Sequence, residues 1–261
     1  MQFYIFQLIS IGNIKTIYRD KTNRKDKVNM VVYELTVKVF LLQDTPVSLV
    51  SGALAQYIDS YLVKDTHFAE LHHKNAIKGY SFDMLSKIEK GMKVYKRDQI
   101  YQFRIRTVNQ DLMSYLMEGI ADHRTNAIKG LTRAVKQIPR KPIASVHTCT
   151  PYIFKTSKGY WRDCMGFEEF EQALCASLIH QYESYTSEEV EKNVALYDQI
   201  ELKSKCAIGV SYKGITLLGD KIAMQVSDNE TAQKIFYFTL ANAIGMGPRG
   251  QGFLGFRFVN G

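Results

Sequence analysis

The chain has 261 residues, and its 34 Lys and Arg residues against 26 Asp and Glu residues give a formal net charge of +8. Because 46% of the residues are hydrophobic and only 5 are proline, a disordered or fibrous chain is excluded: enough apolar surface is present to offset the entropy lost on folding. No segment approaches the roughly 20 consecutive apolar residues that cross a bilayer, so we expect a soluble protein without membrane contacts.

Residues 1–29 differ from the chain that follows. A short apolar patch at residues 3–9 precedes a polar run at residues 18–29. The patch has no basic residues before it and no small-residue cleavage site after it, so we do not interpret it as a signal peptide. An appended extension, or an upstream start assigned in error, explains the contrast, and we leave this segment out of the predicted fold.

Residues 30–150 predict the order β-α-β-β-α-β. Residues 31–42 are rich in Val, Tyr, Thr, Phe and Leu, which is typical of a strand, and the apolar residues that follow recur at helical spacing. Asp65 or Thr66 can cap a second, short helix. The expected elements are a strand at 31–42, helices at 48–63 and from about 66 to 74, strands at 80–88 and 99–108, a helix at 111–122 with Asp111 at its N-cap, and a strand at 144–150.

Residues 151–261 repeat that order. We expect a strand at 152–155, a long helix at 167–185, two strands at 200–212 and 215–226 hinged at Lys213-Gly214, a helix at 230–244 and a final strand at 253–259. Two such units predict an α+β protein with two tandem ferredoxin-like (RRM-like) domains, each an antiparallel sheet with helices on one face. The predicted domains are residues 30–150 and 151–261.

The positive charge belongs to the first half of the chain. Residues 1–150 carry a net charge of +10, whereas residues 151–261 carry −2. A run without carboxylates suits a polyanion such as nucleic acid, although a solvated helix face explains it equally well. The basic face of strand 99–108, near Arg104 and Arg106, is expected to neutralise phosphates together with this run. The expected phosphate-binding residues of the run are Arg124, Lys129, Arg133, Lys136, Arg140 and Lys141.

The segment GMGPRGQGFLGF at residues 245–256 is the sharpest local feature. Glycines between a helix and a strand allow positive φ angles and leave backbone N–H groups uncovered, so such a loop can bind phosphate. Arg249 would add a forked donor to the same anion. The segment is neither a Walker loop nor a dinucleotide fingerprint. The expected RNA-binding residues here are Gly245, Gly247, Arg249, Gly250, Gly252, Gly255 and Arg257.

With the predicted fold, this segment resembles the glycine-rich signature of the CRISPR-associated endoribonucleases that cut precursor CRISPR RNA within its repeats. The resemblance covers roughly residue 31 to the end of the chain. In that family a basic residue interrupts the glycines, as Arg249 does here, and a histidine of the first domain performs the cut. The segment LHHKNAIKGYSF at residues 71–82 similarly resembles the family's histidine, short loop, lysine and aromatic-Ser/Thr-Phe strand.

The chemistry of RNA explains why such residues would recur. RNA carries its own nucleophile, the 2′-hydroxyl, so cleavage requires only a base for its proton and an acid for the departing 5′-oxygen. A histidine can take either role near neutrality, and the Lys78 ammonium would stabilise the charge that gathers on the pentacoordinate phosphorus. The expected products are a 2′,3′-cyclic phosphate and a 5′-hydroxyl, formed without a metal ion or cofactor.

The resemblance implies His72, Tyr57 and Lys78 as catalytic residues. His72 follows Leu71 and precedes Lys78 by six residues, as in the family pattern, but the neighbouring His73 remains an alternative, since adjacent side chains on a helix diverge by about 100°. Tyr61 is likewise an alternative to Tyr57. On one unbroken helix Tyr57 and His72 would lie about 22 Å apart, so the break at Asp65-Thr66 is required.

The cysteines and the other histidines give weaker indications of function. Cys149, Cys164, Cys175 and Cys206 are too widely spaced for a zinc cage, and we expect reduced thiols in a cytoplasmic protein. Among the other histidines, His67 and His123 are expected to contact RNA, whereas His147 and His180 are expected to be structural.

The function that the resemblance implies is that of a metal-independent endoribonuclease acting on CRISPR repeat RNA. The alternative is a protein that binds CRISPR RNA for an effector complex without cutting it, because the glycine-rich loop and the basic run serve both functions. A generic single-strand RNA binder is a weaker third hypothesis, since no RNP-type aromatic motif is present. The expected partners are the repeat RNA and subunits of a CRISPR effector complex, and a homodimer is left open.

Overall fold

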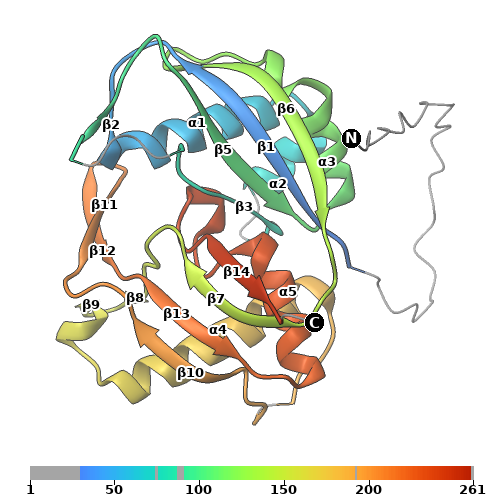
Figure 1. Ribbon diagram of the computed structural model, residues 1–261, viewed down its shortest axis with the longest axis vertical. Helices are drawn as coiled ribbons and strands as arrows, with labels where there is room; N and C mark the ends of the chain where they lie inside the picture. Colours follow the sequence, from blue (N-terminus) through green and yellow to red (C-terminus); the bar gives the residue numbers. More distant parts are fainter. Residues whose placement is uncertain (1–29, 74–75, 87–90, 192, 260–261) are drawn as a thin grey trace, which may run out of the picture.

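The computed structural model describes residues 30–73, 76–86, 91–191 and 193–259. It consists of two four-stranded antiparallel sheets, with the first half of the chain in the upper part of Figure 1 and the second half below it. Residues 1–29, which we left out of the predicted fold, lie outside the described residues. Both predicted ferredoxin-like units are present, so the fold class is confirmed.

The first sheet has the strand order β3-β5-β1-β6. Its helices cover one face, where Leu35, Val37 and Val39 of β1 enter a core that also contains Tyr57 and Phe103. The elements of this unit are β1 (Val32–Leu41), α1 (Val50–Leu62), α2 (Thr66–His73), β3 (Tyr80–Phe82), β5 (Ile100–Thr107), α3 (Gln110–Gly119) and β6 (Ile128–Ile138).

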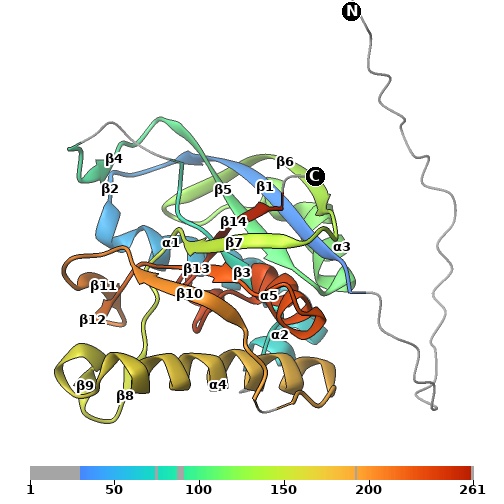
Figure 2. The ribbon, with the colours of Figure 1, turned by 60° about the horizontal axis from the view of Figure 1, so that its bottom comes forward.

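The second sheet has the strand order β10-β13-β7-β14. Its helices pack on one face around Phe170, Leu178, Phe236 and Phe238 (Figure 2). Helix α5 also contacts strands of the first sheet, so it lies where the two domains meet. The elements are β7 (Ile143–Thr148), α4 (Phe167–Thr186), β10 (Tyr197–Leu202), β13 (Ile222–Val226), α5 (Glu230–Asn242) and β14 (Leu254–Phe258).

Short elements connect these strands and helices. A separate hairpin of β11 and β12 turns at Lys213 and Gly214, both at positive φ, and this confirms the predicted hinge. No helix in the described ranges is long and apolar enough to cross a membrane. The short elements are β2 (Thr45–Pro46), β4 (Val94–Tyr95), β8 (Lys155–Thr156), β9 (Gly159–Tyr160), β11 (Ile208–Tyr212), β12 (Ile215–Gly219), and the 3₁₀ turns η1 (Val47–Leu49), η2 (Ile120–Asp122), η3 (Trp161–Asp163) and η4 (Gly247–Arg249).

The boundary between the domains differs from the predicted one. The strand expected at 144–150 is present as β7, but it pairs with β13 and β14 of the second sheet. The fourth strand of the first sheet is β6, which pairs with β1 and holds part of the basic run. Basic residues and a β-bulge, both common in edge strands, interrupt the alternation of apolar and polar residues in β6. This strand was therefore not predicted. The boundary therefore lies between β6 and β7, not after residue 150.

Three local predictions are corrected as well. Helix α3 is capped by Asn109, whose side chain accepts from the Leu112 N–H at 3.0 Å, and Asp111 lies in its first turn instead. The strand expected at 80–88 is regular only in β3, and residues 87–90 lie outside the described part of the chain. The segment at 152–155 forms no strand of the main sheet: Tyr152 makes an isolated bridge to Asp220.

By contrast, the Asp65 cap of α2 is confirmed, since its carboxylate accepts from the His67 and Phe68 N–H groups.

A buried arginine of the first domain contacts the second domain. Arg106 of β5 is 1% exposed and pairs with Glu34 of β1, with 2.7 Å between Nε and Oε2. Its Nη1 also donates to the Leu254 carbonyl of β14 at 2.5 Å, and its guanidinium lies 4.3 Å from the centre of the Phe253 ring. Burial lowers the pKa of Arg106, and the charge of Glu34 partly opposes this change. Arg106 therefore stabilises the contact between the sheets and is not available to RNA, contrary to our expectation.

Replacing Arg106 tests this contact. Arg106→Ala should lower the free energy of unfolding by about 3–5 kcal/mol, because it leaves the Glu34 carboxylate buried without its main partner. Chemical denaturation measures this change. Lys38→Ala, which removes an exposed charge from the neighbouring strand, is the control and should change the free energy by less than about 0.5 kcal/mol; similar losses for the two variants would contradict this role of Arg106.

Candidate functional site

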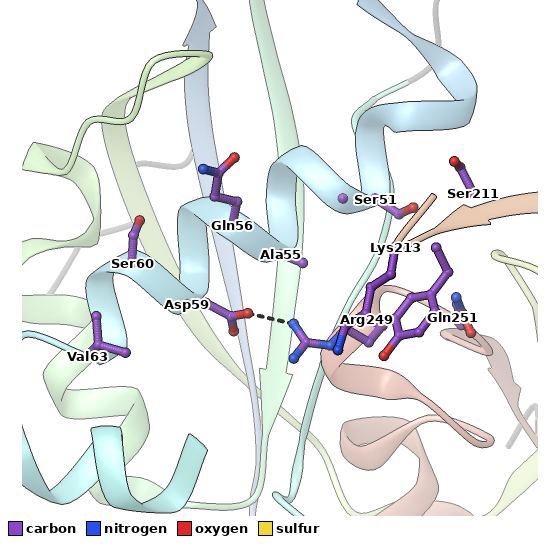
Figure 3. Close-up of a pocket in the computed structure, with 12 residues that line it drawn as sticks. Ser51, Ala55, Gln56, Asp59, Ser60, Val63, Ser211, Lys213, Arg249 and Gln251 are labelled. Carbon is purple, nitrogen blue, oxygen red and sulfur yellow. Dashed lines mark hydrogen bonds and ion pairs between the residues drawn. The ribbon is translucent and has the colours of Figure 1, made fainter. Parts of the chain in front are cut away.

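A cavity of about 570 Å³ lies where the two domains meet (Figure 3). Helix α1 of the first domain forms one wall, and the glycine-rich segment and the β11–β12 hairpin of the second domain form the others. Most of the residues that line it carry polar or charged side chains. The lining residues are Ser51, Gly52, Ala55, Gln56, Asp59, Ser60, Val63, Ser211, Tyr212, Lys213, Arg249 and Gln251.

An ion pair crosses one side of this cavity. Arg249 ends η4, and its Nη1 lies 2.5 Å from Oδ2 of Asp59 on α1 (Figure 3). Burial disfavours the guanidinium charge, but the hydrogen bond and the negative charge of Asp59 outweigh it and raise the pKa of Arg249. The pair therefore keeps the Arg249 guanidinium of the second domain charged and in contact with helix α1 of the first.

The glycines hold the loop against strand β3. A side chain at Gly247 would meet the Tyr80 carbonyl oxygen at 3.0 Å, and one at Gly250 would meet the Phe82 ring at 2.5 Å. Gly250 also has a φ of 70°, a conformation that residues with a side chain rarely adopt. Only glycine lets η4 come this close to β3, and this approach brings Arg249 to the cavity.

The expected phosphate cradle is not present in this arrangement. The backbone N–H groups of residues 247, 249, 250, 251 and 252 all donate to carbonyl oxygens within the protein. Gly245 and Gly255 do not line the cavity, and Arg257 donates from β14 to the Ser145 hydroxyl at 3.2 Å. Of the seven residues expected to bind RNA in this segment, the structure thus brings only Arg249 to the cavity.

Lys78 lies close to this ion pair. Its pKa is lowered by burial and by the positive charge of Arg249, and the negative charge of Asp59 partly opposes the change. Its Nζ also donates to the carbonyl of Leu71 at 2.8 Å. Leu71 belongs to the last turn of α2, which ends at His73. Lys78 is therefore hydrogen-bonded to the turn that carries both candidate histidines. The side chains of His72 and His73 lie outside the described part of the structure.

Tyr57 is not at this site. Its side chain is fully buried in the core of the first domain, and its hydroxyl donates to the Ile120 carbonyl. Tyr61 is also buried, and its hydroxyl donates to the Tyr115 carbonyl at 3.0 Å. Hydroxyl groups held this way do not reach a phosphate in the cavity, so we leave both tyrosines out of the site.

The basic run follows strand β6 and the connection to β7. None of its six residues lines the cavity. Arg124, Lys129 and Lys141 are exposed, and Lys136 is exposed although its Nζ lies 3.0 Å from Glu34. Arg133 is partly buried beside Asp122, and Arg140 lies over the Tyr237 ring. The run is therefore an edge strand rather than a helix face, with most of its charges on the surface.

Two further histidine expectations are reversed. His123 is 6% exposed, and its two ring nitrogens lie 2.8 Å from the Ser60 hydroxyl and 3.0 Å from Lys64 Nζ. His123 is therefore held inside the first domain instead of contacting RNA. His147 is exposed on β7 and does not pack in the core, whereas the exposed His67 remains open to a ligand.

Four lining residues with side chains that can contact a ligand were not predicted from the sequence. Asp59 has the pattern of an ordinary polar residue of an amphipathic helix, and Gln251 is one residue within the glycine-rich segment. Tyr212 and Lys213 lie at the predicted hairpin hinge, but no local pattern indicates that this turn faces α1. The structure shows it, because β11 contacts η1 at the start of that helix.

Comparisons with known proteins show the fold. No family model matches the chain, and no curated protein matches its sequence. The tandem ferredoxin-like arrangement is nevertheless shared with several solved structures. "CRISPR associated protein Cas6" is 16% identical over 87% of this chain and 99% of its own, with a TM-score of 0.63. "An RAMP protein binding different RNA substrates" is 16% identical over 86% and 99%, with a TM-score of 0.65. A Cas6-related protein from Pyrococcus furiosus is 16% identical over 87% and 98%, with a TM-score of 0.60.

The position of His123 predicts how stability depends on pH. Burial, and then the charge of Lys64, lowers the pKa of His123 below its ordinary value of 6.5. Between the two values the unfolded chain binds more protons than the folded one, so the free energy of unfolding should fall as the pH drops below about 6.5. His123→Gln should make this dependence shallower in denaturant unfolding from about pH 5 to 8. His180→Gln, at an exposed position of α4, should leave the slope unchanged; equal slopes for all three proteins would contradict the assignment.

Proposed function

We propose that this protein is an endoribonuclease that cuts precursor CRISPR RNA within its repeats. The observation that carries the proposal is that Lys78, which is hydrogen-bonded to the last turn of α2, lies within electrostatic range of the Arg249–Asp59 pair. One of these two cations thereby contacts the helix end that contains two histidines, and the other, from the second domain, lies near enough to act on it. This is the combination of charge and proton carrier that RNA cleavage by its own 2′-hydroxyl requires.

The solved structures of the same fold support the choice of substrate. Their printed descriptions include a Cas6 product complex, which is 12% identical with a TM-score of 0.56 over 87% of this chain, and the RAMP protein that binds RNA substrates. These descriptions, together with the glycine-rich segment and the histidine-lysine segment of this chain, favour CRISPR repeat RNA over other polyanions.

The proposed reaction proceeds in one displacement at phosphorus. The base removes the proton of the 2′-hydroxyl, the 2′-oxygen attacks the adjacent phosphorus, and the bond to the 5′-oxygen breaks as that oxygen receives a proton. The products are a 2′,3′-cyclic phosphate and a 5′-hydroxyl. No water or metal-bound hydroxide enters this step, so the proposed reaction is independent of metal ions.

In this proposal His72 moves the protons, and Lys78 and Arg249 hold the phosphate. The Lys78 ammonium donates to the carbonyl of Leu71, the residue directly before His72. This hydrogen bond keeps the ammonium beside the turn of α2 that carries the histidine. Negative charge grows on the phosphoryl oxygens towards the transition state, and both cations then stabilise it more than they stabilise the substrate. The exposed charges along β6 would neutralise phosphates further along the RNA.

The histidine assignment is tested by a pair of variants. Labelled repeat RNA from the neighbouring array is incubated with each protein in excess EDTA, and the products are resolved on a denaturing gel. The unmodified protein should cut, whereas His72→Ala should cut at least about 100-fold more slowly, because general acid-base catalysis supplies about 10²–10⁴-fold.

His73→Ala is the matched control for this experiment and should keep most of the activity. Full activity of His72→Ala with loss in His73→Ala would move the assignment by one residue. If the unmodified protein binds the RNA but leaves it uncut, the chain is a binding protein and the catalytic proposal fails.

The charges around Lys78 predict opposite shifts of the pH profile. Activity that needs the Lys78 ammonium falls as the pH rises through the pKa of this lysine. Arg249 lowers that pKa and Asp59 raises it. Arg249→Gln should therefore move the alkaline limb of the rate profile to higher pH while lowering the plateau about 10²–10³-fold, and Asp59→Asn should move the limb to lower pH. Shifts in the same direction would exclude Lys78 as the group that titrates.

A further inference from the structure

The cavity is larger than the proposed cleavage chemistry requires. Arg249 and Asp59 occupy one side of it, whereas most of its wall is the exposed face of α1 and the tip of the β11–β12 hairpin (Figure 3). Its volume of about 570 Å³ falls in the range of roughly 300–1,000 Å³ that small-ligand sites occupy. The hairpin forms a two-stranded sheet of its own and is not part of the main sheet of the second domain.

The hairpin brings an aromatic ring and a cation to the cavity. Tyr212 is half-buried, and its hydroxyl is close enough to Arg249 to influence the charge of the guanidinium. Lys213 is exposed, and its Nζ lies 5.6 Å from the centre of the Tyr212 ring. In Figure 3 the Lys213 side chain lies between the first turn of α1, near Ser51, and Arg249. A ring beside two cations suits a nucleotide, because the base can stack while its phosphate meets the positive charges.

Buried polar atoms without partners gather around the same loop. Gln251 is 2% exposed and lines the cavity, yet its Oε1 has no hydrogen-bond partner within the described residues. The hydroxyls of Tyr80 and Ser81, on the strand beneath η4, are also buried without partners there. Buried polar groups are nearly always hydrogen-bonded in folded proteins. Of these three residues only Gln251 lines the cavity, so its amide oxygen is the acceptor that a ligand in the cavity can complete.

We propose that this cavity binds a single unstacked nucleotide of the RNA next to the scissile phosphate, with its base on Tyr212 and a base amino group donating to Gln251. The proposal rests on the proposed function for the identity of the RNA. Lys213 and Arg249 contact the flanking phosphates. Tyr212 and Gln251 are thus specificity-determining residues supplied by the second domain, Lys213 holds the backbone beside them, and the catalytic residues of the first domain act on the neighbouring phosphate.

The acceptors at the base of the cavity determine which nucleotide fits. Gln251 Oε1 and the Asp59 carboxylate both accept hydrogen bonds. Adenine, cytosine and guanine carry an exocyclic amino group, so each offers at least two N–H hydrogens to this pair of acceptors, whereas uracil has no amino group and offers only its N3–H. Uracil can therefore satisfy one of the two acceptors but not both. A buried acceptor that stays unpaired opposite the wrong base lowers affinity. Uracil is therefore the base that this cavity disfavours.

A randomised RNA pool tests this proposal. The unmodified protein is incubated with RNA that is random over a central segment, and the ends of the cut molecules are sequenced. Uracil should be depleted at one position next to the cut. Tyr212→Ala and Gln251→Leu should each abolish this depletion, and Tyr212→Ala should weaken RNA binding about tenfold, the cost expected for one lost stacking contact.

Matched variants separate specificity from folding. Tyr212→Phe keeps the ring and should keep the base preference, and Lys158→Ala removes an exposed lysine near the turn of the β8–β9 hairpin and should change nothing. Gln251→Leu should unfold at the same temperature as the unmodified protein, since the lost amide oxygen has no hydrogen-bond partner among the residues that the structure describes. An unchanged base preference in both Tyr212→Ala and Gln251→Leu would overturn the proposal.

The same experiment distinguishes the two proposals. If the protein retains RNA without cutting it, the retained molecules are sequenced instead. Depletion of uracil at one position, abolished in Tyr212→Ala, would then support the nucleotide site while the cleavage proposal fails. Cut RNA with no base preference at any position would leave the cleavage proposal intact and overturn the nucleotide site. RNA that is neither bound nor cut would overturn both.

Discussion

The buried contact of Arg106 with Glu34 and the Leu254 carbonyl is the interaction on which the rest of the structure depends. It places a charge from the first sheet against the last strand of the second, with the Phe253 ring on its face. Taking a guanidinium out of water is costly unless its partners are well placed. The two sheets therefore have one favourable arrangement. The positions of the groups in the candidate site depend on that arrangement.

The glycine-rich segment places Arg249 of the second domain next to the first domain. Its glycines serve close packing rather than an open anion cradle, because Gly247 and Gly250 bring η4 against β3 and most of the loop amides are already hydrogen-bonded. That approach carries Arg249 to Asp59, and Asp59 and Arg249 then act in opposite directions on Lys78. A substitution that enlarged one of these glycines would displace the arginine without touching any group that reacts.

In the proposed function the two kinds of basic residue have separate roles. The charges along β6 are mostly exposed on an edge strand, where they suit the sequence-independent attraction of a long polyanion. Arg249 and Lys78 are partly buried where the domains meet, where a charge acts more strongly on a single phosphate because less water screens it. Neither domain alone contains the site: the first supplies α1, Lys78 and the end of α2, and the second supplies Arg249 and the hairpin.

The amino-acid sequence by itself determined the fold class, most of the helices and strands, the turn at Lys213-Gly214 and the break before α2, because these follow from local periodicity, capping and turn chemistry. It did not determine which sheet the strand at 143–148 joins or that β6 is a strand at all, since pairing partners and edge strands depend on contacts far along the chain. Only the tertiary structure decided that Tyr57 is buried, that Arg106 binds across the domains, and that Asp59, Tyr212 and Gln251 face one cavity. The physical reason is that a side chain's environment comes from elements distant in sequence, which local patterns do not encode.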